Sequence, residues 1–390
     1  MPTRQGWTAV VAGATSFAAG RTFGLIELYV LGVGLIAIVV IAMFAVQRRP
    51  ARLSTQRQVH PSIVHAGEQA RVDLTLHNGD ARTSPPLELW EPVGGRGGAP
   101  MQLAALRRGE SASASYRVPT VARGSIELGP VQATRRDVLG LCRRTTEIPG
   151  GERLLVVPFH VPVPFASTGG GRLGEVLRMK AYAQTGNEFE ALRDYVTGDD
   201  LRRVHWKATA RSTGLIVRET AVEGVRRCTV VLDRDAGQFD HDGFERAVSA
   251  AASVVTGAAA AALGTRLVAA DADLRGPTVA QDALRWLATV IPHRRDGRVA
   301  GGVTGGAAGI SLGAGDGLGL VVVVTGAPSS PLLTELRRGL VPEETLVVVA
   351  TRGAPVGRGL VVDASSFEAF LDGWAGLVHS RGPRAAGGRR

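Results

Sequence analysis

Cysteine is scarce in this chain, with two residues, Cys142 and Cys228, among 390. Two thiols so far apart in sequence exclude a disulfide framework and a cysteine zinc site, and they are typical of a reducing compartment. The eight histidines form no H-E-x-x-H or H-x3-H spacing, and the sequence has no G-x-x-x-x-G-K-[ST] phosphate loop and no G-x-S-x-G nucleophile turn. The common catalytic signatures are absent, so we expect no enzymatic activity and no cofactor.

Aromatic residues are few (5%), and only two of the 45 basic residues are lysine. The apolar fraction of 45% is nevertheless that of an ordinary globular protein, and 390 residues suggest two or three domains. The net charge of +10 is compatible with a nucleic-acid partner, but nine of the ten excess charges lie in residues 1–57 and 381–390. Because the body between them is almost neutral, we expect no nucleic-acid partner, and residues 381–390 are predicted to be a basic disordered tail.

The strongest local signal is residues 28–46, nineteen uncharged residues that are long enough to span a bilayer as a helix. Residues 5–20 are uncharged but less apolar. They form either a first transmembrane helix, which makes residues 1–50 a transmembrane hairpin, or a signal-peptide-like stretch with a weak Ala-x-Ala pattern. Under both alternatives the positive-inside rule predicts a cell-membrane protein whose soluble domains face the cytoplasm, since four arginines follow the second run: Arg48, Arg49, Arg52 and Arg57.

Residues 51–157 are predicted to form an all-β sandwich. Apolar side chains alternate with polar ones over residues 70–77, at Ala70, Val72, Leu74 and Leu76. This period of two indicates a half-buried strand, and similar short segments follow between glycines and prolines. The alternative, an irregular linker rich in glycine and proline, would leave those apolar faces exposed.

Residues 221–380 alternate continuous apolar strands with helical patterns, which predicts an α/β domain with a doubly wound parallel sheet. The segment 228–233 is the first such strand, and Asp242 with Glu245 is expected to cap the helix after it. Further helices are predicted near residues 279–291 and 331–339 and from Ser365 onward.

Residues 158–220 contain the densest polar stretch of the chain. Gly198 with Asp199 and Asp200 predicts a turn that opens a short helix, and residues 215–219 predict a strand. Mixed charges in a segment too short for its own core indicate a packed network of arginine and aspartate that clamps two domains or a partner. In this interpretation Trp206 and Tyr195 are buried, and any docking role falls to Arg202 and Arg203.

The run RDYVTGDDLRRVHWKATAR, followed by LIVRE, resembles the signature of the bacterial "domain of unknown function 58" family. The resemblance implies the same layout of membrane hairpin, β-sandwich, motif segment and von Willebrand factor A-like domain. It implies no settled activity, but it does imply protein partners, either a MoxR-type AAA+ ATPase or a transglutaminase-like membrane protein. We therefore expect a membrane-anchored, non-catalytic interaction module for assembly or cell-envelope processes. The matching positions are Arg193, Tyr195, Gly198, Asp199, Arg202, His205, Trp206, Ala210, Arg211 and Leu215.

Domains similar to von Willebrand factor A can hold a divalent cation, with D-x-S-x-S after the first strand and an Asp after a later one. Here Asp235 and Gly237 occupy the two serine positions after Asp233, and Thr325 begins the segment where the later Asp is expected. We predict a degenerate site without metal, in which Asp233 and Asp235 pair with arginine.

A membrane-bound hydrolase is the alternative function, with His205 as general base beside Asp199 or Asp200. Spacing alone satisfies no geometric test for such a site. A hydrogen-bonded histidine within the arginine and aspartate network is the simpler interpretation.

Overall fold

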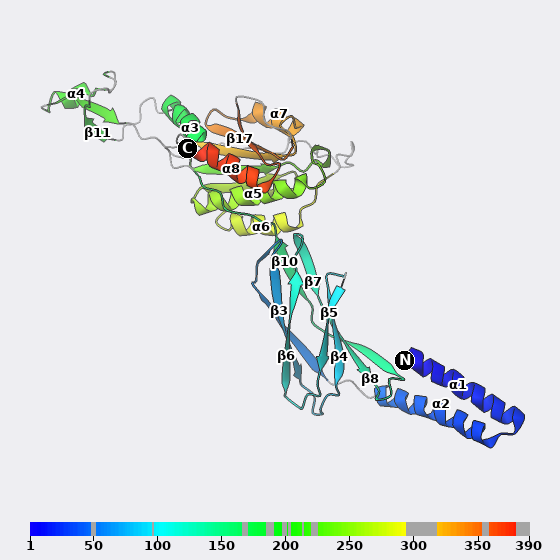
Figure 1. Ribbon diagram of the computed structural model, residues 1–390. Coiled ribbons are helices and arrows are strands. Elements are labelled where there is room, and N and C mark those ends of the chain that lie inside the picture. The colour runs from blue at the N-terminus through cyan, green and yellow to red at the C-terminus, as the bar shows by residue number, and fades with distance from the viewer. Residues whose placement is uncertain are drawn as a thin grey trace, which may run out of the picture. The chain divides into compact units, whose positions relative to one another are not determined.

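The computed structural model describes residues 1–47, 52–95, 97–165, 171–184, 191–196, 201, 204–212, 214–219, 225–293, 318–352 and 359–379. The chain divides into two compact units, Met1–Val157 and Pro158–Arg390 (Figure 1). The tail predicted at residues 381–390 lies outside the described residues.

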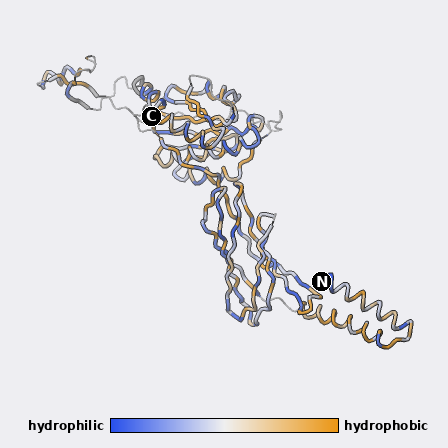
Figure 2. The backbone as a smooth tube through the Cα atoms, in the orientation of Figure 1, coloured by the Kyte–Doolittle hydropathy of each residue, from blue (hydrophilic) through white to orange (hydrophobic). Residues whose placement is uncertain are grey.

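The first unit begins with two paired helices, α1 (Arg4–Phe23) and α2 (Ile26–Gln47). The turn between them uses Gly24 in the left-handed conformation, with φ of 71°. The helices touch through glycine, because a Cβ on Gly32 of α2 would lie 2.6 Å from the backbone nitrogen of Phe17 in α1. Among the described helices, α2 is the one long and apolar enough to cross a membrane by length and composition (Figure 2). The predicted helical pair is present, but α1 does not pass that test.

Two sheets follow in the same unit. The first has the order β1 (Leu53–His60), β3 (Gln69–Asn78), β6 (Ser111–Pro119). The second has the order β2 (Val64–His65), β10 (Glu152–Val157), β7 (Gly124–Leu128), β4 (Leu87–Val93), β8 (Val131–Arg136), β9 (Arg143–Ile148), and β5 (Gly97–Leu103) pairs with β4.

The two sheets pack against each other through the apolar face of β3. Its alternation is confirmed, since Ala70, Val72, Leu74 and Leu76 are at most 1% exposed. These side chains share two buried clusters with residues of the second sheet, among them Leu89, Val131, Leu128 and Val156. The core of the first unit therefore lies between the sheets.

Arg57 is buried in the sandwich and does not flank the apolar helix as a free charge. Its Nε donates to Glu91 Oε1 at 2.5 Å, and the two side chains are 4% and 0% exposed. Arg57 lies in β1 and Glu91 in β4, so this ion pair joins the two sheets. The other three arginines were also expected to set the orientation of α2 across the membrane. Arg52 is exposed, while Arg48 and Arg49 lie outside the described residues.

The second unit contains a six-stranded sheet of order β15 (Ala272–Arg275), β14 (Gly264–Ala269), β13 (Arg227–Leu232), β16 (Gly319–Thr325), β17 (Glu344–Ala350), β18 (Leu360–Asp363). Five strands are parallel, but β15 runs antiparallel to β14. The predicted parallel sheet is therefore present except at this edge, where the two residues between β14 and β15 permit a hairpin and no crossover.

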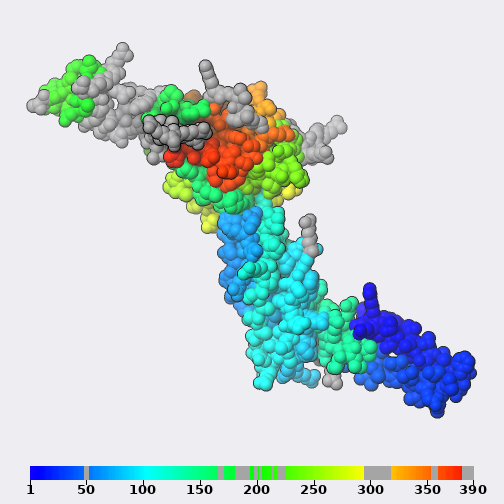
Figure 3. Space-filling view, viewed as in Figure 1, coloured from blue at the N-terminus to red at the C-terminus, as the bar shows by residue number. Residues whose placement is uncertain are grey.

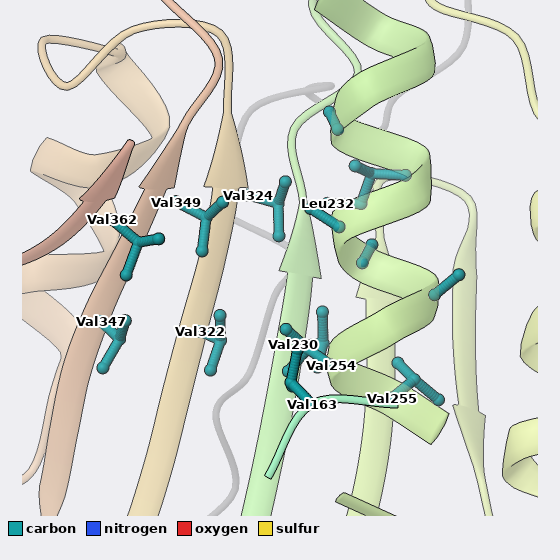
Figure 4. Packing of buried hydrophobic residues seen from close by; sticks show 14 of the residues in the cluster. Val163, Val230, Leu232, Val254, Val255, Val322, Val324, Val347, Val349 and Val362 are labelled. Atoms are coloured by element: carbon teal, nitrogen blue, oxygen red, sulfur yellow. The ribbon is translucent and has the colours of Figure 1, made fainter. Parts of the chain in front are cut away.

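Helices cover both faces of this sheet. The cluster on one face joins α5 (Gly243–Ala260), α6 (Val279–Thr289), α8 (Phe367–Val378) and the start of α3 (Gly171–Gln184) to the strands. On the other face, α7 (Pro331–Gly339) packs on alternate strand residues. In β13, for example, Val230 and Leu232 belong to the first cluster (Figure 4). Val231 between them belongs to the second cluster. Burial on both faces explains why these strands read as continuous apolar runs.

Two predicted helix starts need correction. Asp242 precedes α5 but makes no side-chain capping hydrogen bond. α8 is capped by Ser366, whose hydroxyl accepts the Ala369 N–H at 3.0 Å, whereas Ser365 donates to Asp363 Oδ2. Helix α3 was not predicted from the sequence.

Candidate functional site

The described part of the motif segment is a small hairpin with one helical turn. Strands β11 (Ala191–Asp194) and β12 (Ile216–Glu219) are antiparallel, and Arg193 pairs with Val217. Tyr195 extends the pairing, since its N–H donates to Leu215 O at 2.8 Å. Val204 forms a bridge to Val217, and these two side chains are 6% and 2% exposed.

His205 organises the short helix α4 (Trp206–Thr209). Its Nδ1 accepts the Ala208 N–H at 3.0 Å, and its own N–H donates to Ile216 O at 2.7 Å. A neutral imidazole whose Nδ1 accepts a hydrogen bond carries its proton on Nε2. The histidine is therefore the N-cap of a helix that begins at Trp206, whereas the predicted turn at residues 198–200 lies outside the described residues.

Trp206 is exposed, so the prediction that it is buried is wrong. Its side chain is 67% exposed, and Leu201 and Val196 are 59% and 63% exposed. The reason is local: a helix of four residues has a single turn, and the buried positions of this segment are taken by Val204 and Val217. Ala210 and Arg211 are exposed too, at the end of the turn.

Several predicted motif residues lie outside the described residues: Gly198, Asp199, Asp200, Arg202 and Arg203. The packed arginine and aspartate network and the pairing of His205 with Asp199 or Asp200 therefore remain predictions.

A second polar site lies at the carboxyl edge of the six-stranded sheet. Asp233 directly follows β13, Thr325 ends β16, and Ser330 precedes α7. Asp233 Oδ2 accepts hydrogen bonds from Thr325 Oγ1 at 2.8 Å and from Ser330 Oγ at 2.6 Å. The Asp235 N–H donates to Asp233 Oδ1 at 3.1 Å. This is where the strand order reverses between β13 and β16, the place at which open α/β sheets bind ligands.

The hydroxyl of Ser330 donates its hydrogen bond to the Asp233 carboxylate and does not cap helix α7. Ser330 occupies the N-cap position of α7 without a side-chain capping bond. Asp233, Thr325 and Ser330 are 5%, 0% and 1% exposed. A buried carboxylate is strongly unfavourable without hydrogen-bond donors, and the two hydroxyls and one amide supply them.

Among the described residues, Asp233 and Asp235 do not form the predicted ion pairs with arginine, and the neighbouring Arg234 is bound elsewhere. Arg234 is buried, forms an ion pair with Asp271, and donates from Nε to Ile291 O at 3.0 Å. Its guanidinium lies 5.7 Å from the centre of the Trp286 ring. The Asp235 carboxylate instead accepts the Gly237 N–H at 3.0 Å.

The donor set near Asp233 includes two residues that the sequence did not single out as partners, Thr325 and Ser330. The sequence did contain a signal for them, because Thr325 ends a buried strand and Ser330 directly precedes the next helix, so both could be expected at the carboxyl edge of the sheet. No group of three or more His, Cys, Asp or Glu side chains that could hold a metal occurs in the part of the chain that the structure describes. The prediction of a degenerate metal site stays a prediction.

Comparison with known proteins supplies two sequence matches. The family model "Protein of unknown function DUF58" matches residues 191–300. "Uncharacterized protein YeaD" of Bacillus subtilis (strain 168) is 25% identical over 240 residues, which are 58% of this chain and 56% of that protein. The match thus spans just over half the length of this curated relative.

Solved structures show only weak likeness. The CARDB domain of a Pyrococcus furiosus protein, solved with di-metal ions, has a TM-score of 0.21 at 13% identity and covers 28% of this chain and 93% of its own. A β-glucosidase from Erythrobacter marinus has a TM-score of 0.17 at 13% identity, covering 25% and 16%. Scores this low carry no argument about fold or function. The two sequence matches, in contrast, show that residues 191–300 are similar to the family described as Protein of unknown function DUF58 and that the chain has a distant relative in Bacillus subtilis.

Proposed function

We propose that the chain is a membrane-anchored module that binds protein partners and has no catalytic activity of its own. The observation that carries the proposal is the exposure of Trp206, with Leu201 and Val196, on the motif segment. Binding free energy in protein interfaces concentrates in tryptophan, tyrosine and arginine. An exposed tryptophan among polar and charged neighbours is therefore suited to docking.

Membrane anchoring is proposed for the helix pair. The composition of α2 and the glycine contacts between α1 and α2 support it, since small residues allow the close helix approach typical of membrane bundles. The arginines after α2 favour a cytoplasmic position for both compact units. An alkaline phosphatase fused after residue 390 should then be inactive, because that enzyme matures outside the cytoplasm. High activity of the fusion would contradict both the hairpin and the compartment.

The α/β part of the second unit is proposed to be a von Willebrand factor A-like domain. Its strand order, the single antiparallel edge strand and the position of Asp233 after β13 support this likeness. Following the family resemblance, the proposed partner is a MoxR-type AAA+ ATPase or a transglutaminase-like membrane protein, in assembly or cell-envelope processes.

A non-catalytic role is supported by the bonding of His205. Its Nδ1 is engaged with a backbone N–H of α4, so that nitrogen is not free to accept a substrate proton while the helix is formed. Capping a helix is a structural role for this imidazole.

Purification of the tagged full chain from native membranes tests the docking role. Trp206→Ala should lose co-purification of the AAA+ ATPase, because removing an interface tryptophan costs about 2 kcal/mol or more of binding free energy. Trp90→Ala is the matched control, since Trp90 is also exposed (41%) but lies on β4 of the sandwich. An unchanged partner list for a folded Trp206→Ala chain would remove the motif segment from the interface.

A further inference from the structure

The turn between β8 and β9 carries an apolar tip between two pairs of arginines. Residues 135–144 read RRDVLGLCRR, and the strand register places Arg135 opposite Arg144 and Arg136 opposite Arg143. Like charges directly opposite one another destabilise a strand pair. Arg136 already forms an ion pair with Glu88 at 3.2 Å, so it is the Arg135–Arg144 pair that favours a further nearby anion.

The side chains at the tip of the turn are exposed, but backbone N–H groups of the turn donate hydrogen bonds within the protein. Val138 and Leu139 are 104% and 61% exposed. The carboxylate of Asp137 accepts the N–H groups of Leu139 at 3.0 Å and Cys142 at 2.5 Å. A backbone polar group without a partner is strongly unfavourable in hydrocarbon, so this internal bonding lowers the cost of moving the turn out of water.

The turn is attached to the helix pair. Thr3 N donates to Leu141 O at 2.8 Å, and Cys142 is buried in one cluster with Val39 and Val46 of α2. Figure 3 shows the surface of the β8–β9 region next to the blue helices. Because α2 ends at Gln47, the turn contacts its last two turns. A membrane crossed by α2 would therefore have the tip at its cytoplasmic boundary.

Beside the turn, Arg52, Arg135 and Arg144 line a hollow of about 330 Å³. The Arg144 Nη1 also donates to Gln47 O at 2.9 Å, which holds this guanidinium at the end of α2. One acid, Glu147, shares the lining, so positive charge remains in excess. Guanidinium groups bind phosphodiester oxygens, and an apolar floor suits the glycerol and first methylenes of a lipid. That floor includes Leu53, Leu87, Ala133 and Ile148.

We propose that the β8–β9 turn inserts into the boundary between headgroups and acyl chains of the cytoplasmic leaflet, where its arginines bind the phosphates of anionic phospholipids. This inference rests on the proposed crossing of the membrane by α2. Val138 and Leu139 at the tip of the turn then lie in the acyl region. Arg135 and Arg144, which lie in the strands behind the tip, are then at the depth of the lipid phosphates. The bound lipid offsets the repulsion between Arg135 and Arg144.

Depth-dependent quenching tests the insertion. The full chain carries an environment-sensitive NBD label on Val138→Cys, in vesicles of equal parts phosphatidylcholine and phosphatidylglycerol, while native Cys142 and Cys228 are buried and protected from labelling. Controls are Ile41→Cys on α2 (67% exposed) and Val121→Cys (86% exposed), which follows β6 at the end of the sandwich away from α2. We expect doxyl-labelled lipids to quench the labels at 138 and 41, but not at 121.

The outcomes separate this inference from the proposed function. Quenching at position 41 without quenching at 138 would overturn insertion of the turn and leave the membrane anchor intact. No quenching at either position would overturn both.

A second measurement addresses the phosphates. Spin-labelled phosphatidylglycerol should associate with the full chain more strongly than phosphatidylcholine, and Arg135→Gln/Arg144→Gln should lower this preference by about fivefold per arginine. The matched control is Arg71→Gln/Arg117→Gln, an opposed arginine pair on β3 and β6 in which Arg71 already bonds Asp73. Equal association of both lipids with the wild-type chain, or an equal loss in the control, would overturn the phosphate role.

Discussion

Ser330 Oγ donates a hydrogen bond of 2.6 Å to Asp233 Oδ2, and this bond links the end of β13 to the start of α7. The two residues are 97 positions apart in the chain. The bond explains why Ser330 leaves its own helix without a side-chain cap. It also makes Ser330 part of the environment that keeps a buried carboxylate stable at the carboxyl edge of the sheet.

Ser330→Ala should therefore lower the free energy of unfolding of the second unit by about 1.5–3 kcal/mol, the cost of removing a hydrogen bond to a charged group. Urea unfolding of the full chain, followed by tryptophan fluorescence, measures the change. Ser365→Ala is the matched control, since Ser365 also donates to an aspartate, Asp363, but is exposed. We expect about 0.5 kcal/mol or less there. Equal losses in the two variants would contradict the importance of the Asp233 environment.

Magnesium or manganese at millimolar concentration should not raise the melting temperature of the full chain. Gly237 has no side-chain ligand, Asp235 is turned toward the Gly237 N–H, and both hydroxyls near Asp233 already donate to it. A cation at about a hundred times its Kd would stabilise the fold by about 2.7 kcal/mol, which a melting curve resolves. A rise that EDTA reverses would refute the degenerate site.

Trp206→Ala should change the free energy of unfolding by only about 0.5 kcal/mol, because the side chain is 67% exposed. Trp374→Ala is the opposite case. Trp374 is fully buried and its Nε1 donates to Pro164 O at 2.8 Å, so its loss should cost about 3–5 kcal/mol. Thermal and urea unfolding compare the two variants. A large loss for Trp206→Ala would restore the clamp that the sequence first suggested.

The buried pair of Arg57 and Glu91 should behave as a unit. Arg57→Met alone leaves an uncompensated buried carboxylate and should cost about 3–5 kcal/mol, and Glu91→Met should cost a similar amount. The double variant should recover most of that loss, because replacing a buried ion pair by apolar side chains is often neutral. A double-mutant cycle measures the coupling, and simple addition of the two single losses would show that the pair is not coupled.

Much of the fold could be predicted from local periodicity. The apolar run of α2, the alternation in β3 and the buried strands β13, β16 and β17 could be predicted because an apolar environment on one or on all sides leaves an alternating or a continuous apolar pattern in the sequence itself. The antiparallel edge strand β15 and helix α3 were missed, since their short or weakly patterned segments carry no such repeat.

The sites depended more on contacts between distant segments. The motif was recognisable from its residues, but whether Trp206 is buried or exposed depends on what packs beside a single helical turn, and periodicity does not report that. Arg57 looked like a charge flanking the membrane until the second sheet brought Glu91 against it.

The sequence by itself determined where apolar surface must be buried, and with it the helix pair and the layered sheets, because hydrophobic burial acts on a pattern that neighbouring residues share. Only the tertiary structure decided which polar side chains meet: Ser330 and Thr325 at Asp233, Asp271 and Trp286 at Arg234, and the arginine pairs around Val138 and Leu139. A hydrogen bond or ion pair depends on distances of a few ångströms between residues far apart in the chain, and those distances exist only once the chain has folded.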